Sequence, residues 1–171
     1  MIIGHGDIAS VLKDKKDTIF FAAGVSNSGE TRESEYKREE NLLLNQNQSK
    51  HLIYFGSLST FYNPETRYAK HKRHMEDLVR KYFKHYTIVR MGNITWGKNP
   101  HTLINYFRNA VKTGKKLKIW DTYRYLINKR EFLHWVSLIP NWNCEMNITG
   151  QKMKVKHIVK KYVTKHKSRS S

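Results

Sequence analysis

The stretch from His51 to Lys72 reads HLIYFGSLSTFYNPETRYAKHK, and it combines an apolar run with a longer charged segment. Its first five residues, His51–Phe55, predict a strand that stops at Gly56–Ser57. After a loop containing Pro64, the spacing predicts a long helix from about 65 to 83. A strand without polar alternation is typical of a parallel sheet that is covered on both faces. The stretch therefore predicts one strand–helix unit of an α/β protein.

Similar apolar runs occur on both sides of this unit. TIFFAA at 18–23 closes at Gly24, and YTIVRM at 86–91 ends at Gly92-Asn93. Amphipathic segments alternate with these runs, as expected for a parallel sheet with crossover helices. The expected strands are 1–4, 18–23, 51–55, 86–91, 116–120 and 144–148, and the expected helices are 7–12, 33–44, 65–83, 102–111, 131–139 and 155–163. The sequence therefore predicts a Rossmann-like α/β fold in a single domain.

Charge is the unusual bulk property: 32 Lys and Arg oppose 14 Asp and Glu, for a net charge of +18. Such a field attracts polyanions, including nucleic acid and nucleotides. A lysine-rich, solvated surface explains the same number equally well. The single cysteine, Cys144, excludes an intramolecular disulfide and fits a reducing compartment. With no membrane-length apolar run and no signal-peptide pattern at Met1–Gly4, we expect a soluble, cytoplasmic protein.

A glycine-rich turn follows the first expected strand. Gly4-His5-Gly6-Asp7-Ile8-Ala9 fits the dinucleotide pattern G-x-G-x-x-G/A. Gly4 would allow the tight turn, Gly6 would let a pyrophosphate approach the backbone, and Ala9 would let a helix pack closely on the sheet. The helix N-terminus would present free N–H groups to the phosphates. Asp7 counts against this interpretation, because its carboxylate would lie near them.

Tyr68 and Lys72 are four residues apart and would share one face of the expected helix. An ammonium beside a phenol favours the phenolate, so Tyr68 could exchange a proton with an alcohol or ketone. Ser57 and Ser59, at the carboxyl end of the preceding strand, could hydrogen-bond the same oxygen. The spacing alone is weak evidence, because Tyr125 and Lys129 match it as well. Only Tyr68 follows an apolar strand that ends in Ser-x-Ser and lies at the start of a helix, so for Tyr125 and Lys129 we expect only a solvated helix face.

At these residues the chain resembles the extended or atypical short-chain dehydrogenase/reductases, in the branch of NAD-dependent epimerases and dehydratases that act on nucleotide sugars. IIGHGDIA resembles the first strand–helix turn of that family, and FFAAGVSNS resembles the segment that lies over the cofactor. LIYFGSLSTF and YAKHK resemble the serine and Tyr-x-x-x-Lys segments, and IVRMGNITWG resembles a strand-end loop. MNITG is weakly similar to the turn that opens the family's last helix. These segments occur in the family's order between about Ile2 and Val163.

The resemblance implies a catalytic role for four residues. Tyr68 would be the general acid/base, and Lys72 would bind the nicotinamide ribose and tune Tyr68. Ser57, with Ser59 as the alternative, would hold the substrate carbonyl. The reaction would be a reversible hydride transfer at a carbon of a nucleotide sugar.

The resemblance also implies binding residues. NAD or NADP would be the cofactor, and the residue that would choose between them is missing. Arg90 and Asn93 would lie at the mouth of the substrate pocket. Gly4, Gly6 and Ala9 would line the pyrophosphate, whereas Ala22, Ala23 and Gly24 would line the adenosine ribose.

The chain departs from the family in its length. The second and third strands, which form most of the adenine pocket, are missing, and the substrate lobe is reduced. We therefore expect a truncated NAD(P)-binding domain over 1–163, with a reduced substrate lobe at 121–163 and a basic tail at 164–171.

Two further interpretations stay open. One is a catalytically inactive member of the fold that binds nucleic acid or a protein through its basic surface; the other is a partner that completes its sheet or pocket with another chain, including a second copy. The nine histidines show no metal-ligand spacing, so no metal site is expected. A stripe of lysines near the C-terminus is either a solvated helix face or a phosphate contact: Lys152, Lys154, Lys156, Lys160, Lys161, Lys165 and Lys167.

Overall fold

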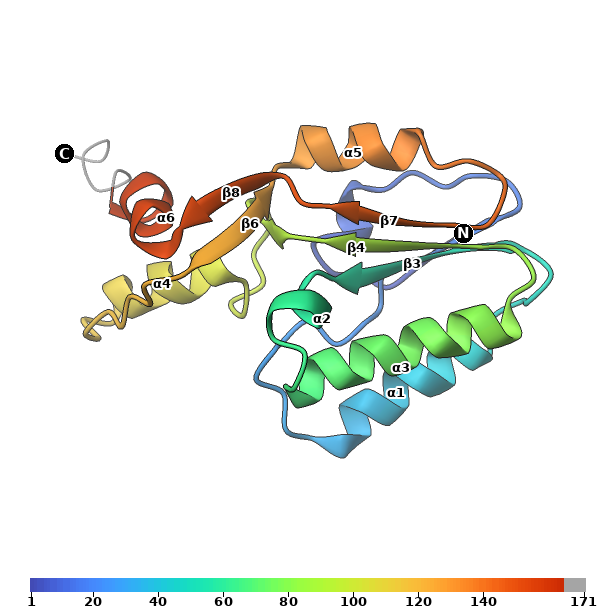
Figure 1. The fold of residues 1–171 in the computed structure, drawn as a ribbon, viewed down its shortest axis with the longest axis horizontal. Helices are drawn as coiled ribbons and strands as arrows, with labels where there is room; N and C mark the ends of the chain where they lie inside the picture. Colours follow the sequence, from blue (N-terminus) through green and yellow to red (C-terminus); the bar gives the residue numbers. More distant parts are fainter. Residues whose placement is uncertain (165–171) are drawn as a thin grey trace.

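A computed structural model describes residues 1–164. In these residues, five parallel strands form the main sheet in the order β1-β2-β3-β4-β7 (Figure 1). The strands are β1 (Ile2–Ile3), β2 (Thr18–Phe21), β3 (His51–Ser57), β4 (Tyr86–Met91) and β7 (Cys144–Ile148). The predicted α/β fold class is confirmed, and so are the bounds of β4 and β7. No strand of the described part pairs with the outer edge of β1, so the sheet is reduced on that side.

Helices cover both faces of this sheet, which explains why its strands are continuously apolar. Helices α1 (Glu33–Leu44) and α3 (Arg67–Tyr82) lie on one face, and α5 (Lys129–Ser137) lies on the other with the N-terminal segment (Figure 1). Along β2, Ile19 and Phe21 pack toward α1 and α3, and Phe20 packs toward α5. The helix predicted at 33–44 is confirmed exactly, and the helix predicted at 65–83 is confirmed as α3.

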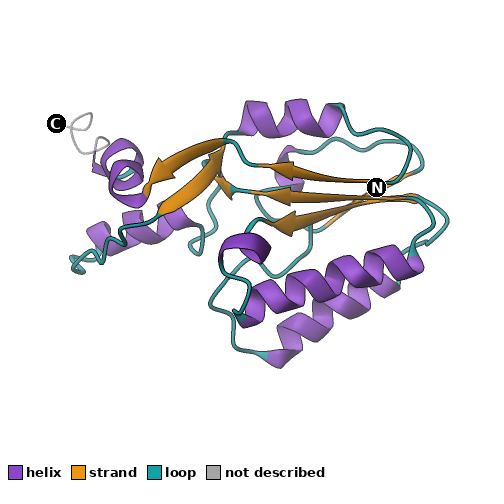
Figure 2. Cartoon of the chain, viewed as in Figure 1, coloured by secondary structure: helices purple, strands orange, loops and turns teal. Residues whose placement is uncertain are grey.

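A small lobe extends from the carboxyl ends of the strands (Figure 2). Its sheet has the order β5-β6-β8, with β5 parallel and β8 antiparallel to β6. Helices α4 and α6 pack against it through Ile104, Leu126 and Ile158. The elements are β5 (Asn93–Ile94), α4 (Leu103–Lys112), β6 (Tyr123–Ile127), β8 (Gln151–Lys154) and α6 (Val155–Tyr162).

Three sequence predictions need correction. The helix expected at 7–12 is wrong, because only a 3₁₀ turn at Ala9–Val11 forms. The strand expected at 116–120 is also wrong: this segment is irregular, and the lobe uses 123–127 instead, where Leu126 and Ile127 are buried. Strand β3 continues through Gly56 and Ser57, because both pair with β4. A short helix, α2 (Ser59–Tyr62), follows directly.

The predicted basic tail at 164–171 lies outside the described residues except for Thr164. None of the helices in residues 1–164 is long and apolar enough to cross a membrane.

Candidate active site

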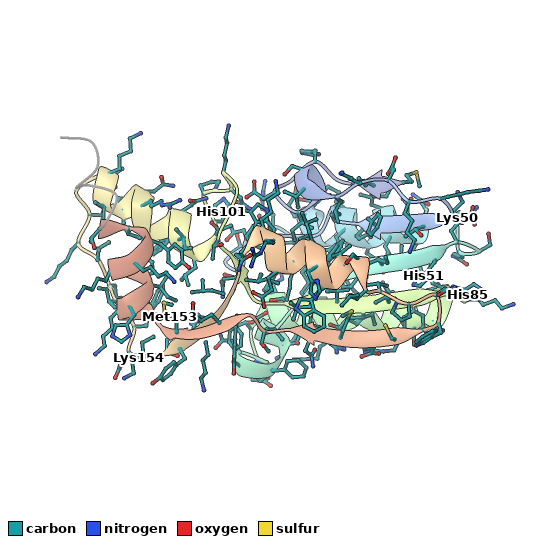
Figure 3. The ribbon with its side chains drawn as sticks, turned by 90° about the horizontal axis from the view of Figure 1, so that it is seen from above. Lys50, His51, His85, His101, Met153 and Lys154 are labelled. Carbon is teal, nitrogen blue, oxygen red and sulfur yellow. The ribbon has the colours of Figure 1, made fainter. Side chains whose placement is uncertain are left out.

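A cavity of about 1180 Å³ lies where the carboxyl ends of the main strands meet the lobe. Its lining residue His101 sits at this junction, and Lys50, His51 and His85 mark the opposite, amino ends of β3 and β4 (Figure 3). Open α/β sheets bind ligands at the carboxyl end of their strands. The cavity gathers most of the residues singled out in the sequence: Gly4, Gly6, Ala22, Ala23, Gly24, Ser57, Ser59, Tyr68, Lys72 and Asn93.

The glycine turn forms the entrance from β1. Gly4 has a φ of +115°, and a Cβ there would lie 2.6 Å from the Ala22 carbonyl oxygen, so a larger residue does not fit. Gly6 faces open space. Ala9 is buried in the 3₁₀ turn and does not line the cavity. Only a three-residue turn forms here, so the expected helix N-terminus is absent. Such a turn has almost no macrodipole, and only the backbone N–H groups of the turn remain to bind an anion.

Asp7 in the glycine turn makes contacts with the loop at 96–99. Its carboxylate accepts hydrogen bonds from the backbone N–H groups of Lys98 and Asn99, both at 2.9 Å. Its carbonyl oxygen accepts a further bond from the Trp96 indole at 3.0 Å. Asp7 therefore ties the glycine turn to the loop that leads into the lobe, and it also lines the cavity.

The two serines lie together at the end of β3. The Ser57 hydroxyl donates to the Ser59 hydroxyl at 2.9 Å, and the Ser59 N–H donates to the Ser57 hydroxyl at 3.2 Å. Both side chains line the cavity, so the structure brings both candidates to the same place. Sequence alone could not decide between them, because the turn from β3 into α2 sets both orientations.

Tyr68 and Lys72 lie in the first turns of α3, which begins after Thr66. The Thr66 hydroxyl accepts the Ala69 N–H at 3.2 Å and caps the helix. The Lys72 Nζ lies 5.5 Å from the centroid of the Tyr68 ring, and both residues line the cavity. The expected shared helix face is therefore present. Lys72, however, is only 2% exposed and not a solvated lysine.

The carboxylate of Glu39 is the partner of Lys72. Its oxygens lie 2.9 and 3.2 Å from the Lys72 Nζ, and Glu39 is fully buried. The sequence reasoning missed Glu39, because the charged run EYKREE at the start of α1 is typical of a solvated surface. No signal in the sequence separates this one carboxylate from its exposed neighbours.

Arg90 and Asn93 have different surroundings. The Asn93 side chain lines the cavity and donates to the Tyr125 carbonyl oxygen at 3.1 Å. Arg90 lies outside the cavity, where it binds Glu76 at 2.8 and 2.5 Å and Glu145 at 2.7 Å. Side chains of β4 alternate between the two faces of the sheet, and Arg90 lies on the face that α3 covers. Its guanidinium is therefore engaged by these two acids.

Further lining residues of the cavity come from the lobe and from α2. Tyr106 and Trp120 stack with their ring centroids 6.2 Å apart, and the Arg124 guanidinium lies 5.3 Å from the Tyr62 ring centroid. Trp120 belongs to the segment that was wrongly predicted as a strand. Its position is set by packing against Tyr106 and Phe107 of α4, a tertiary contact that the pattern of apolar residues in the sequence does not reveal.

Comparison with protein-family models gave a match to the NAD dependent epimerase/dehydratase family over residues 4–138. The chain belongs to this family. The expected resemblance is thus confirmed for most of the chain. Comparison with curated proteins gave no match.

Solved structures with the same fold include nucleotide-sugar enzymes. MoeE5 in complex with UDP-glucuronic acid and NAD is 18% identical, with a TM-score of 0.66. The Bordetella bronchiseptica enzyme WbmG, with NAD and UDP, is 15% identical (0.63), and the UDP-glucose 4-epimerase of Thermotoga maritima, with UDP-glucose, is 17% identical (0.62). Each alignment covers 84% of this chain but only 60%, 55% and 59% of the other. At this identity the likeness concerns the fold.

Proposed function

We propose that this cavity binds NAD or NADP together with a nucleotide sugar, and that Tyr68 and Lys72 assist hydride transfer at a sugar carbon. The supporting observation is the convergence of a glycine turn, two serines, a tyrosine and a buried lysine on one cavity. These residues come from distant parts of the chain, and the family match rests on the same region. The proposal concerns a chain that spans 55–60% of the length of the three solved proteins named above.

The residues present fit one half of a dinucleotide better than the other. In the described part of the chain, the backbone N–H groups of Gly6, Asp7 and Ile8 have no hydrogen-bond acceptor, and Gly6 leaves room for a close approach. Lys72 lines the same cavity, is 2% exposed, and would contact the nicotinamide ribose. The adenine half would extend toward the outer edge of β1, where the sheet ends and provides few walls.

Each proposed residue has a defined task in this reaction. A bound nicotinamide would supply the hydride acceptor and donor. The Tyr68 phenolate would take the proton of the sugar hydroxyl and so become the phenol, which would return the proton in the reverse step, and the Lys72 ammonium would stabilise the negative charge of the phenolate oxygen. The Ser57 or Ser59 hydroxyl would donate to the same substrate oxygen and orient it. Asn93 and Arg124 would line the substrate end of the cavity.

Dinucleotide binding tests this proposal first. Thermal unfolding should be followed with NAD⁺, NADH, NADP⁺ and NADPH, each at millimolar concentration, followed by a screen of UDP-sugars in the presence of the best binder. A ligand at about 100 times its Kd should stabilise the protein by about 2.7 kcal/mol. If none of the four changes the midpoint, the proposal is wrong.

A second candidate function, nucleic-acid binding by an inactive member of the fold, is favoured by one observation on the lobe. The Nζ atoms of Lys152 and Lys154 lie 5.0 and 5.5 Å from the centroid of the exposed Tyr123 ring. They border a surface hollow of about 440 Å³ that Lys156 and His157 also line. An aromatic ring among lysines suits a stacked base between phosphates. Binding of single-stranded RNA that weakens steeply with salt, and is lost in K152A/K154A, would support this candidate.

A further inference from the structure

The ammonium of Lys72, a residue that lines the cavity, is held by a fully buried acid. Glu39 on α1 binds it with both carboxylate oxygens, at 2.9 and 3.2 Å. A Cβ on Gly24 would lie 2.6 Å from the Lys72 Nζ and 2.8 Å from the Glu39 Oε1. Gly24 therefore leaves room for the ion pair directly beneath the end of β2. This close approach gives Gly24 a reason to be glycine besides its expected contact with a cofactor.

Glu39 is held in place from several elements at once. The backbone N–H of Val25 donates to it at 2.7 Å, and the Tyr54 hydroxyl on β3 donates at 3.0 Å. The His71 Nε2 on α3 lies 3.1 Å away. Together with Lys72, these groups satisfy both oxygens of a carboxylate that is fully buried. The acid is a fixed point to which the flexible lysine side chain is tied.

The charges of the pair depend on each other. Burial alone would raise the pKa of Glu39, but the Lys72 ammonium and the hydrogen bonds to His71, Lys72 and Val25 lower it to about 2. Burial alone would lower the pKa of Lys72, and attraction to Glu39 outweighs burial and raises it. A lone charge at this depth would be costly, whereas the paired charges are both retained.

We propose that Glu39 is a positioning residue, which fixes the Lys72 ammonium against Gly24 and directs its remaining N–H into the cavity. Two of the three N–H groups of Lys72 face Glu39, and one is left for a hydroxyl of the bound ligand. The inference deepens the proposed function, since it rests on Lys72 contacting the ribose of a dinucleotide. Without Glu39, Lys72 would lose its charge more easily, and its side chain would be free to change rotamer.

The titratable groups around Lys72 come from each element packed against it. Besides Glu39, they are Tyr36 on α1, Tyr54 on β3, and Tyr68 and His71 on α3 itself. Tyr54 is fully buried, and burial followed by the charge of Glu39 raises its pKa well above its usual value. In this group Glu39 is therefore the acid that holds the charge of Lys72.

Labelling of individual lysines with trace acetic anhydride, quantified by mass spectrometry across pH, tests this directly and needs no cofactor. In the wild-type protein, Lys72 should react at least about tenfold more slowly than exposed Lys70 at about pH 9. E39Q should raise the labelling of Lys72 about tenfold, because its pKa falls. E40Q, on the same helix, is the matched control, since among the described residues Glu40 forms an ion pair only with the exposed His74. Labelling of Lys72 that matches Lys70, or that E39Q leaves unchanged, would overturn the inference.

Ligand affinity provides the functional readout. For wild-type protein and E40Q, the Kd for NAD⁺ should stay level between about pH 7 and pH 9, whereas in E39Q it should rise about tenfold over this range. E39D retains a carboxylate and should restore a level pH profile. An equal loss in E39Q at every pH would indicate a merely structural role and overturn the inference.

Folding and function can be separated in the same experiment. If E39Q does not fold, E39Q/K72M replaces the charged pair with a neutral one and should fold, and the labelling test then compares Lys72 with Lys70 in the wild-type protein. A double variant that also fails to fold, together with wild-type labelling of Lys72 that matches Lys70, would overturn the inference. If wild-type protein binds no NAD⁺, the proposed function fails, and the labelling still decides whether Glu39 controls Lys72.

Discussion

Two buried carboxylates lie between the main sheet and its helices, and their surroundings differ. Glu39 on α1 is 0% exposed, and its cation Lys72 lines the cavity. Glu76 on α3 is 2% exposed, and its cation Arg90 points away from the cavity toward a second acid, Glu145. A buried ion pair by itself therefore does not mark a site. The first pair differs from the second in that its cation lines the cavity and is bound by a single acid.

The largest expected effect concerns the cavity side of this comparison. Tyr68→Phe removes only the phenol oxygen, so kcat should fall by about 10²–10⁴ while the Kd for NAD⁺ changes less than about twofold. Steady-state turnover of the best UDP-sugar, with NAD⁺ binding by calorimetry, measures both. Tyr125→Phe, at the other Tyr-x-x-x-Lys match, is the control for loss of a tyrosine hydroxyl. A kcat that is unchanged in Tyr68→Phe would contradict the assigned role.

The two ion pairs should also differ in stability. Lys72→Met leaves Glu39 buried without its cation and should cost about 3–5 kcal/mol. Arg90→Met should cost less, about 1–3 kcal/mol, because Glu76 keeps Arg80 at 3.4 Å. Urea unfolding at neutral pH gives both values. If Arg90→Met were the more damaging change, the contrast between the two pairs would be lost.

Acid should act more strongly on Glu39 than on Glu145, although both have a pKa near 2. Hydrogen bonds from Arg80, opposed by burial, and then from Arg90, lower the pKa of Glu145 to about 2, but its side chain is 34% exposed and screened by solvent. A folded-state pKa below the usual 4.5 contributes stability above about pH 4.5 that is lost as the pH falls toward 2. E39Q should therefore flatten the loss of stability between pH 5 and 2 more than E145Q does. Urea unfolding at several pH values tests this order.

The smallest effect is expected at an exposed pair beside the same cavity. Arg38 binds Glu35 at 3.0 Å, with side chains 45% and 30% exposed. Arg38→Ala should cost no more than about 0.5 kcal/mol, because water screens the charges. This variant gives the baseline for the two buried pairs, and a loss above about 1 kcal/mol would show that burial is not what separates them.

The sheet was predictable because burial on both faces leaves a direct trace in the sequence. TIFFAA, HLIYF and YTIVRM lack polar alternation, and each forms a central strand of the sheet. The lobe was less predictable: β6 carries Tyr123, Arg124 and Tyr125 before its two buried residues, so its pattern is weak. The helix expected at 7–12 did not form, and the 14 residues between β1 and β2 hold only one 3₁₀ turn.

For the candidate site, the sequence identified residues at strand ends but not their partners. Ser57, Tyr68 and Lys72 were identified because an apolar strand, a turn and an amphipathic helix follow one another in this part of the sequence. Glu39 and Arg124 were missed, because their roles depend on packing between α1, α3 and the lobe. Arg90 was expected at the pocket mouth, and the alternation of β4 turns it toward Glu76 instead. Local patterns thus located the cavity, and tertiary contacts decided which charges face it.

Calorimetric titration of NAD⁺ into wild-type protein, Lys72→Met and Lys70→Met tests the central claim most directly. Lys70 lies two residues from Lys72 on the same helix but pairs with exposed Glu65, outside the cavity. The account predicts binding to the wild type and to Lys70→Met with equal affinity, and a loss of at least about tenfold in Lys72→Met. Absence of binding to the wild type, or equal binding to all three proteins, would contradict it.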